Sequence, residues 1–178
     1  MKNCSQFGII LRKEREKKGI PLWKLAASVP FPASNLQRIE TGITEPRICT
    51  AMKILATLGG DAGSFMQTLA ESQSWDIYQA PERFSAEILA VILEELCAEG
   101  SVLDVCPKGL FGIYFRRVRV ILELSQSAIA TRSDYTTRSL IAVESGNQEP
   151  KIMRALQLVW VTGVPVSSFF KLLAQRIK

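Results

Sequence analysis

NLQRIETGITEPR, residues 35–47, and SLIAVESGNQEPK, residues 139–151, both carry the pattern Glu-x-Gly-x-x-Glu-Pro within one chain of 178 residues. An apolar residue precedes the first Glu of each pattern. A shift of 104 residues superimposes the two stretches, and the register holds without a gap from residues 7–70 to residues 111–174. The identical pairs include Phe7/Phe111, Arg12/Arg116, Arg15/Arg119, Ala26/Ala130, Leu36/Leu140, Glu40/Glu144, Gly42/Gly146, Pro46/Pro150, Gly59/Gly163 and Phe65/Phe169. A gapless match of this length predicts two copies of one small domain.

Each copy is expected to form five short helices. In the first copy they cover a segment that ends near residues 18–19, then residues 21–28, 33–40, 48–58 and about 62–71. Glycines follow several of these segments and a proline opens the second, which is where helices favour those residues. Strand signals are nearly absent, so the fold class is predicted to be all-α. The predicted domains are residues 1–74 and 108–178, joined by a connecting helix in residues 75–107.

The connecting segment contains the stretch APERFSAEILAVILEELCAEG, residues 80–100. Its apolar residues recur at helical spacing, and its acidic residues fall on the other face of the predicted helix. A helix with such an apolar stripe needs a partner surface. It is expected to pack between the two copies or against its twin in a dimer.

Composition excludes several classes of protein. No apolar run approaches the roughly 18 residues that a membrane span requires, and the N-terminus lacks the pattern of a signal peptide, so a cytoplasmic location is expected. The chain has no histidine, and its cysteines at 4, 49, 97 and 106 lack the C-x-x-C spacing of a metal site. We therefore expect free thiols, no metal, no cofactor and no enzymatic activity.

The charges are distributed unevenly. Residues 7–71 carry nine lysines and arginines against six acids, residues 72–110 carry two against seven, and residues 111–178 carry ten against four. Two basic copies thus flank an acidic middle, which suits a polyanion that touches both copies. Ordinary solvated surface is the alternative explanation.

The first copy, through LRKEREKKGIPLWKLAASVPFPASNLQRIETGITEP, resembles the Xre/Cro helix-turn-helix domain of lambda-type phage repressors, and the second copy resembles it again through FRRVRVILELSQSAIATRSDYTTRSLIAVESGNQEP. The two copies cover about three quarters of the chain. The resemblance implies that an arginine of the first helix pairs with the glutamate that ends the third helix. Here these structural pairs are Arg15 with Glu40 and Arg119 with Glu144.

The resemblance also implies that the third helix of each copy enters the major groove of DNA. The candidate base contacts are Ser34, Asn35, Gln37, Arg38, Thr137 and Arg138. Ile141 and Ala142 hold the corresponding later positions of the second copy, where they could touch a thymine methyl group or pack against protein. The candidate phosphate contacts are Arg12, Lys13, Lys24, Arg47, Gln126, Arg132, Lys151 and Arg154.

The first copy departs from the family pattern at its turn. Pro30 stands where a glycine with positive φ is usual, and Pro32 replaces the usual Ser or Thr cap. The third helix of this copy is therefore expected to start later or to tilt. In the second copy Asp134 stands at the glycine position, where it tolerates positive φ better than most residues.

The second copy is more apolar near its end. Trp160, Val161, Val166 and Phe170 are candidates for a partner surface, most simply that of a homodimer, because a domain of about 65 residues has little interior to hide them. The alternative is that they pack on the connecting segment.

These observations predict a sequence-specific transcriptional regulator that binds double-stranded DNA through two helix-turn-helix domains. The alternative is a protein-binding regulatory module, such as an antirepressor, in which one or both copies bind protein. The broken turn and the apolar Ile141 and Ala142 favour that alternative.

Overall fold

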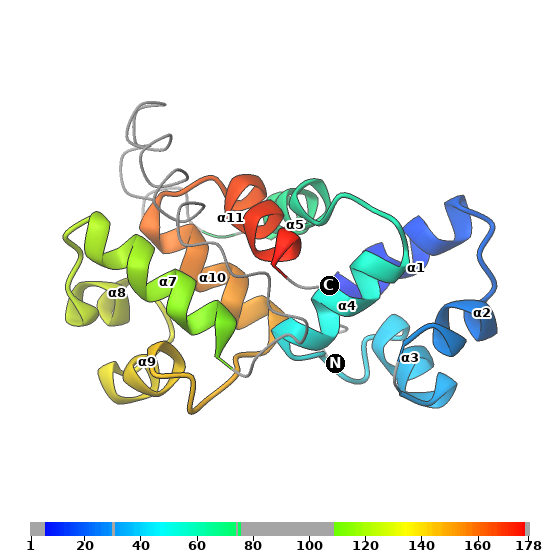
Figure 1. Cartoon of the computed structure of the whole chain (residues 1–178), viewed down its shortest axis with the longest axis horizontal. Helices are drawn as coiled ribbons and strands as arrows, with labels where there is room; N and C mark the ends of the chain where they lie inside the picture. The colour runs from blue at the N-terminus through cyan, green and yellow to red at the C-terminus, as the bar shows by residue number, and fades with distance from the viewer. Residues whose placement is uncertain (1–5, 30, 74, 76–108, 177–178) are drawn as a thin grey trace.

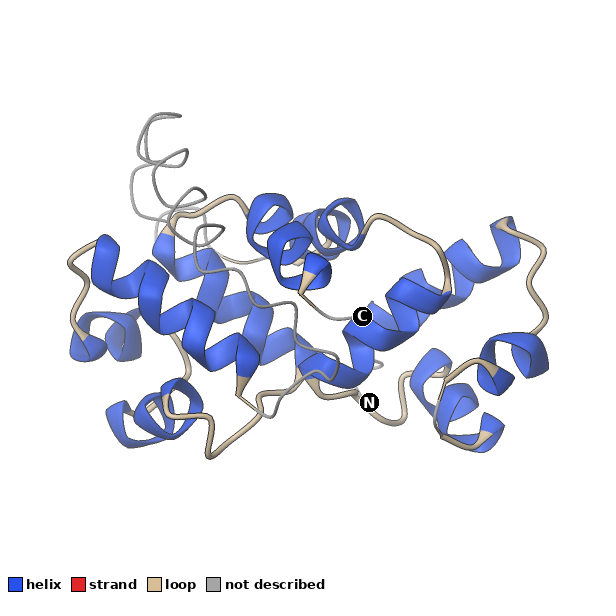
Figure 2. Cartoon of the chain, viewed as in Figure 1, coloured by secondary structure: helices blue, strands red, loops and turns tan. Residues whose placement is uncertain are grey.

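The computed structural model describes residues 6–29, 31–73, 75 and 109–176, and within these residues it contains ten α-helices and no strand (Figures 1 and 2). The predicted all-α fold class is confirmed. The first helical unit comprises α1 (Gln6–Lys17), α2 (Leu22–Ala27), α3 (Ala33–Glu40), α4 (Ile48–Thr57) and α5 (Ala62–Glu71). The second helical unit comprises α7 (Leu110–Ile121), α8 (Gln126–Arg132), α9 (Thr137–Glu144), α10 (Ile152–Thr162) and α11 (Val166–Gln175). The expected connecting helix lies outside the described residues.

The helices of the two units follow the same register. Each helix of the second unit begins 104 residues after its counterpart, as α3 at Ala33 and α9 at Thr137 illustrate. The structural repeat therefore matches the sequence repeat helix by helix.

Local chemistry explains where several helices begin and end. The Asp61 side chain accepts hydrogen bonds from the first backbone N–H groups of α5, and Ser125 and Thr136 cap α8 and α9 in the same way. Gly42 and Gly146 follow α3 and α9 with φ of 71° and 76°, a region that glycine enters without steric cost. The glycine of the repeated pattern thus ends the helix, as expected.

Both predicted ion pairs are present. The Arg15 guanidinium donates to Glu40 at 2.7 and 2.9 Å, and that of Arg119 donates to Glu144 at 2.5 and 2.9 Å. Each arginine also donates from Nη1 to a backbone oxygen in the loop that leads to the next helix, that of Ile20 or Leu124, at 2.7 Å. These bidentate contacts fasten the first helix of each unit to the third.

The two units share one hydrophobic core. Among the described helices the most extensive contact joins α5 to α11, which lie side by side midway along the long axis of the molecule (Figure 1). A Cβ atom on Gly63 of α5 would overlap the backbone oxygen of Ser167 on α11, so the two helices approach more closely than an alanine would allow.

A second contact between the units is reciprocal. The backbone N–H of Ile48 donates to Pro150 at 3.0 Å, and that of Ile152 donates to Pro46 at the same distance, beside an antiparallel bridge between Arg47 and Lys151.

Carboxylates repeat this exchange. Glu149 accepts from the backbone N–H of Cys49 at 2.7 Å, and Glu45 accepts from that of Met153 at 2.8 Å. Each unit thus caps the fourth helix of the other with the same glutamate of the repeat. Equivalent residues that exchange equivalent contacts are the mark of a twofold interface, here formed within one chain.

The four residues that we expected on a partner surface pack within the chain. Val161, Val166 and Phe170 are at most 3% exposed. Trp160 is half-buried, and its ring lies 5.6 Å from that of Trp75. The prediction of a partner surface is wrong for Val161, Val166 and Phe170, because these side chains are already buried within the single chain.

The state of one cysteine differs from the expectation. Cys49 is disulfide-bonded, so the expectation of free thiols is wrong for this cysteine. The cysteines at 4, 97 and 106 lie outside the described residues.

None of the described helices combines the length and the apolar character that crossing a membrane would require.

Candidate nucleic-acid interface

The candidate reading helices are α3 and α9, the third helix of each unit. Figure 1 shows them at the two ends of one long edge of the molecule, with α5 and α11 toward the opposite edge. In α3, Leu36 and Ile39 are buried in the hydrophobic core. Exposed side chains fill the other face, and the predicted base contacts among them are Ser34, Asn35, Gln37 and Arg38.

These four exposed side chains of α3 make no hydrogen bond within the described part of the chain. Two of them, Gln37 and Arg38, offer the donor and acceptor groups that pair bidentately with adenine and guanine. They are thus exposed and uncommitted.

The start of α3 differs from our expectation. Pro32 is the N-cap, with φ of −60° and no side-chain hydrogen bond, and the helix nonetheless begins at Ala33. This is the position that corresponds to the start of α9 at Thr137. The expectation of a later start is wrong, because proline already holds the φ that a helix entrance uses and the buried Leu36 and Ile39 hold the helix in register. Pro30, the other proline of this turn, lies outside the described residues.

The entrance of α9 is better capped. The Thr136 hydroxyl accepts from the Ser139 backbone N–H at 3.1 Å, and the Ser139 hydroxyl accepts from that of Thr136 at 3.0 Å. Asp134 does not adopt positive φ, so the turn before α9 differs from the one that the family pattern implies. Thr137 and Arg138 are exposed, as predicted for base contacts.

The outer face of α9 is less polar than that of α3. Ile141 is 47% exposed and Ala142 is half-buried. Ser139 uses its hydroxyl in the cap, so Thr137 and Arg138 are the polar groups of this face that remain for a ligand.

In each unit the first helix contacts the third helix in the same two ways, through a glycine and through the arginine–glutamate pair. A Cβ atom on Gly8 of α1 would overlap the backbone oxygen of Ile39, and one on Gly112 of α7 would overlap that of Val143. The first helix of each unit therefore packs directly on the backbone of the reading helix, beside the arginine–glutamate pair. Such packing orients a helix rigidly for contact with a partner.

Two corresponding grooves run beside the reading helices. The groove at α3 measures about 530 Å³ and that at α9 about 320 Å³. Arg47 lines both, because the bridge between Arg47 and Lys151 joins the two units at this place. Exposed cations therefore stand between the reading helices as well as on them.

Some of these cations are held in place. Arg154 donates to the Asp134 backbone oxygen at 2.8 Å, and its guanidinium carbon lies 5.6 Å from the centre of the Tyr135 ring. Arg47 donates to the Glu149 backbone oxygen at 2.9 Å. Burial raises the pKa of Tyr135 to about 12, against the opposing effect of Arg154, so this phenol stays neutral near neutral pH. Arg154 also pairs with the exposed Asp134 carboxylate at 3.4 Å, which offsets part of its charge. Arg47 and Arg154 are thus both held in place beside α9.

The other predicted phosphate contacts differ in availability. Lys13, Lys24 and Arg132 are exposed. Arg12 is exposed but pairs with Glu16 at 2.8 Å, which places an acid beside any phosphate that it would hold. Gln126 is half-buried, and its amide donates to Glu144 at 2.8 Å, so it extends the buried ion pair instead of pointing outward.

Exposed apolar side chains near the first reading helix were missed in the sequence. Trp23 of α2 is 69% exposed and Ile43, just after α3, is 63% exposed. The signal was available, because Ser127 and Asn147 hold the corresponding positions of the second copy, and a polar counterpart indicates a surface position.

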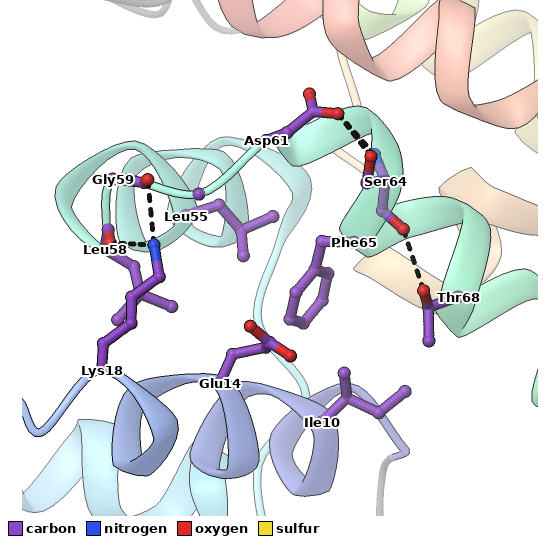
Figure 3. A pocket seen from close by; sticks show the side chains of 11 residues that line it. Ile10, Glu14, Lys18, Leu55, Leu58, Gly59, Asp61, Ser64, Phe65 and Thr68 are labelled. Carbon is purple, nitrogen blue, oxygen red and sulfur yellow. Dashed lines mark hydrogen bonds between the residues drawn. The ribbon is translucent and has the colours of Figure 1, made fainter.

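A third cavity lies away from the reading helices, between α1, α4 and α5, and measures about 270 Å³ (Figure 3). Several of its polar groups cap helix ends: Lys18 donates to the backbone oxygens of Leu58 and Gly59 at 2.9 Å, and Asp61 accepts from Ser64. The Glu14 carboxylate also lines the cavity.

The described residues contain no cluster of acids and cysteines that could hold a metal ion. Comparison with known proteins identified no relative: no protein-family model, no curated protein and no solved structure matches the chain.

Proposed function

We propose that this protein is a sequence-specific DNA-binding transcriptional regulator that places α3 and α9 in the major groove of a duplex. Its two units would be Xre/Cro-like helix-turn-helix domains, in residues 1–74 and 108–178, and it would act in the cytoplasm without catalysing a reaction. The observation that carries the proposal is the uncommitted polar face of α3, exposed beside fixed cations on the edge that also bears α9.

The chemistry of this edge suits a duplex. An α-helix fits the major groove, where Arg38 could pair with guanine and Gln37 with adenine. Lys24, Arg47, Arg132, Lys151 and Arg154 are exposed around the two reading helices and could contact phosphates. Phosphate contacts orient the protein on the duplex, and base contacts select the sequence.

Salt dependence tests the role of the cations. A protein that holds six or more phosphates loses roughly a thousandfold or more in affinity between about 50 and 200 mM salt. We expect such a loss when binding to a duplex selected from a random pool is titrated with salt. Lys24→Ala should weaken binding to selected and random duplexes alike and reduce the slope by about one.

Lys171→Ala is the matched control, because Lys171 is exposed on α11, away from the reading helices (Figure 1). It should leave the slope unchanged. Affinity that is insensitive to salt would contradict the proposal.

A protein-binding module is the second candidate, and a specific observation favours it. Trp23, Ile43 and Ile141 expose apolar surface on or beside the reading helices, and exposed aromatic and aliphatic groups are typical of protein interfaces. This candidate predicts a stoichiometric protein complex that survives high salt, together with weak binding to any duplex.

A further inference from the structure

The reciprocal contacts between the units bear on how a duplex would be read. Dimeric helix-turn-helix proteins present two identical reading helices, and their operators are palindromic for that reason. Here Glu45 and Glu149 exchange equivalent caps, and Pro46 and Pro150 accept equivalent hydrogen bonds, within one chain. One chain therefore already carries the paired arrangement that a dimer would supply.

The tight contact between α5 and α11 makes this arrangement rigid. Gly63 lies against the Ser167 backbone, and these two residues are themselves counterparts in the repeat. The α5 and α11 helices thus cover each other within one chain. A rigid pair of units implies a constant separation between the two reading helices.

The two reading helices differ in chemistry at matched positions. Gln37 and Arg38 of α3 correspond to Ile141 and Ala142 of α9. The first pair offers hydrogen bonds, whereas Ile141 offers a 47% exposed aliphatic side chain. In the major groove the aliphatic partner is the methyl group of thymine.

We infer that a single chain occupies one non-palindromic site made of two unlike half-sites at a constant spacing, with α3 reading its half through hydrogen bonds and α9 reading its half through contact of Ile141 with a thymine methyl group. This inference rests on the proposed function. It specifies the ligand as an asymmetric duplex and the complex as one chain on one duplex.

Selection from random duplexes with the full-length protein tests the inference. We expect a motif with two different halves at one constant spacing, bound by one chain as measured by sedimentation. A palindromic motif bound by two chains, or a motif with a single half, would overturn the inference and leave the proposed function intact. Failure to enrich any sequence would defeat the proposed function itself.

Replacement of thymine by deoxyuridine isolates the methyl contact, because only the methyl group is removed. At one position of the α9 half we expect about a fourfold loss of affinity, the worth of one buried methyl group. In Ile141→Ala the same replacement should cause no further loss, which is the behaviour of two groups in direct contact. Equal losses in the wild type and in Ile141→Ala would contradict the contact.

A double substitution tests the asymmetry from the other direction. Ile141→Gln with Ala142→Arg gives α9 the side chains of α3 at these positions, and selection should then yield two similar halves. Ile113→Gln is the matched control, since Ile113 on α7 is 44% exposed and lies outside the reading helices. It should leave the motif unchanged, and circular dichroism confirms that each variant keeps its helices.

Discussion

At the scale of single residues, the arginine–glutamate pairs show how the repeated pattern serves the fold. The Arg15 side chain is 9% exposed and that of Glu40 is 5% exposed, and the two share two hydrogen bonds. Their hydrogen bond raises the pKa of Arg15, so the guanidinium remains charged. The first glutamate of the repeated pattern therefore holds two helices together.

Arg15→Ala should lower the free energy of unfolding by about 3 kcal/mol, because it leaves the Glu40 carboxylate buried without its partner. Denaturant titration followed by circular dichroism measures the change. Arg12→Ala is the matched control on the same helix: its pair with Glu16 is well exposed, and such pairs contribute little. Equal effects of the two substitutions would show that burial of the pair is unimportant.

Asp61 makes a contribution that depends on pH. The side-chain hydrogen bond from Ser64, with the backbone bonds of Ser64 and Gly63, lowers the pKa of Asp61 below its ordinary 3.8. Because the pKa is lower in the folded state, the ionised carboxylate stabilises the fold at neutral pH. This contribution is lost as the pH falls from about 3.8 through the lowered value of the folded state.

Asp61→Ala should therefore cost about 1 kcal/mol at neutral pH, the usual value of an N-cap, and less in acid. Asp61→Asn keeps a capping oxygen without the charge, so it should lose less than Asp61→Ala and show a flatter pH profile. Unfolding measured at several acidic pH values checks this. A difference between wild type and Asp61→Asn that grows in acid would contradict the account.

At the scale of helices, the approach of α5 to α11 depends on the absence of a side chain at Gly63. Gly63→Ala should destabilise the fold by about 1–3 kcal/mol, since the added methyl group must displace the Ser167 backbone. Gly60→Ala is the control, because the atom nearest to its added Cβ would be the flexible Lys18 Nζ at 3.9 Å. Thermal unfolding separates the two, and equal melting temperatures would mean that the two helices pack loosely.

Helix identity was largely predictable from the sequence, and helix packing was not. Glycine and proline positions indicated the helices that are observed, and the family resemblance implied the two arginine–glutamate pairs, which are present. The start of α3 was misjudged because the missing cap at Pro32 was given more weight than the apolar Leu36 and Ile39, whose burial decides the register. Tertiary burial outweighs a capping preference of about 1 kcal/mol.

The candidate site was predictable to a similar degree. The exposure of Gln37 and Arg38 follows from their spacing between buried residues. The inward hydrogen bond of Gln126 could not be read from the sequence, since it depends on where Glu144 lies in three dimensions.

At the scale of the whole molecule, the sequence left two alternatives for the apolar residues of α10 and α11, a partner surface or packing on the connecting segment, because a domain of about 65 residues has little interior. Val166 and Phe170 are instead buried within the chain, and α11 covers α5 of the other copy. The repeat itself was the overlooked signal, because two copies of a domain that pairs with its twin can pair with each other. The result is one body with α3 and α9 on one edge (Figure 1).

The central claim is that α3 recognises DNA sequence. The most direct test compares the affinities of wild type and Arg38→Ala for a duplex selected from a random pool and for a random duplex of the same length, at one salt concentration. We expect Arg38→Ala to lose about 1–3 kcal/mol on the selected duplex and far less on the random one. An equal loss on both duplexes, or no preference of the wild type between them, would contradict the account.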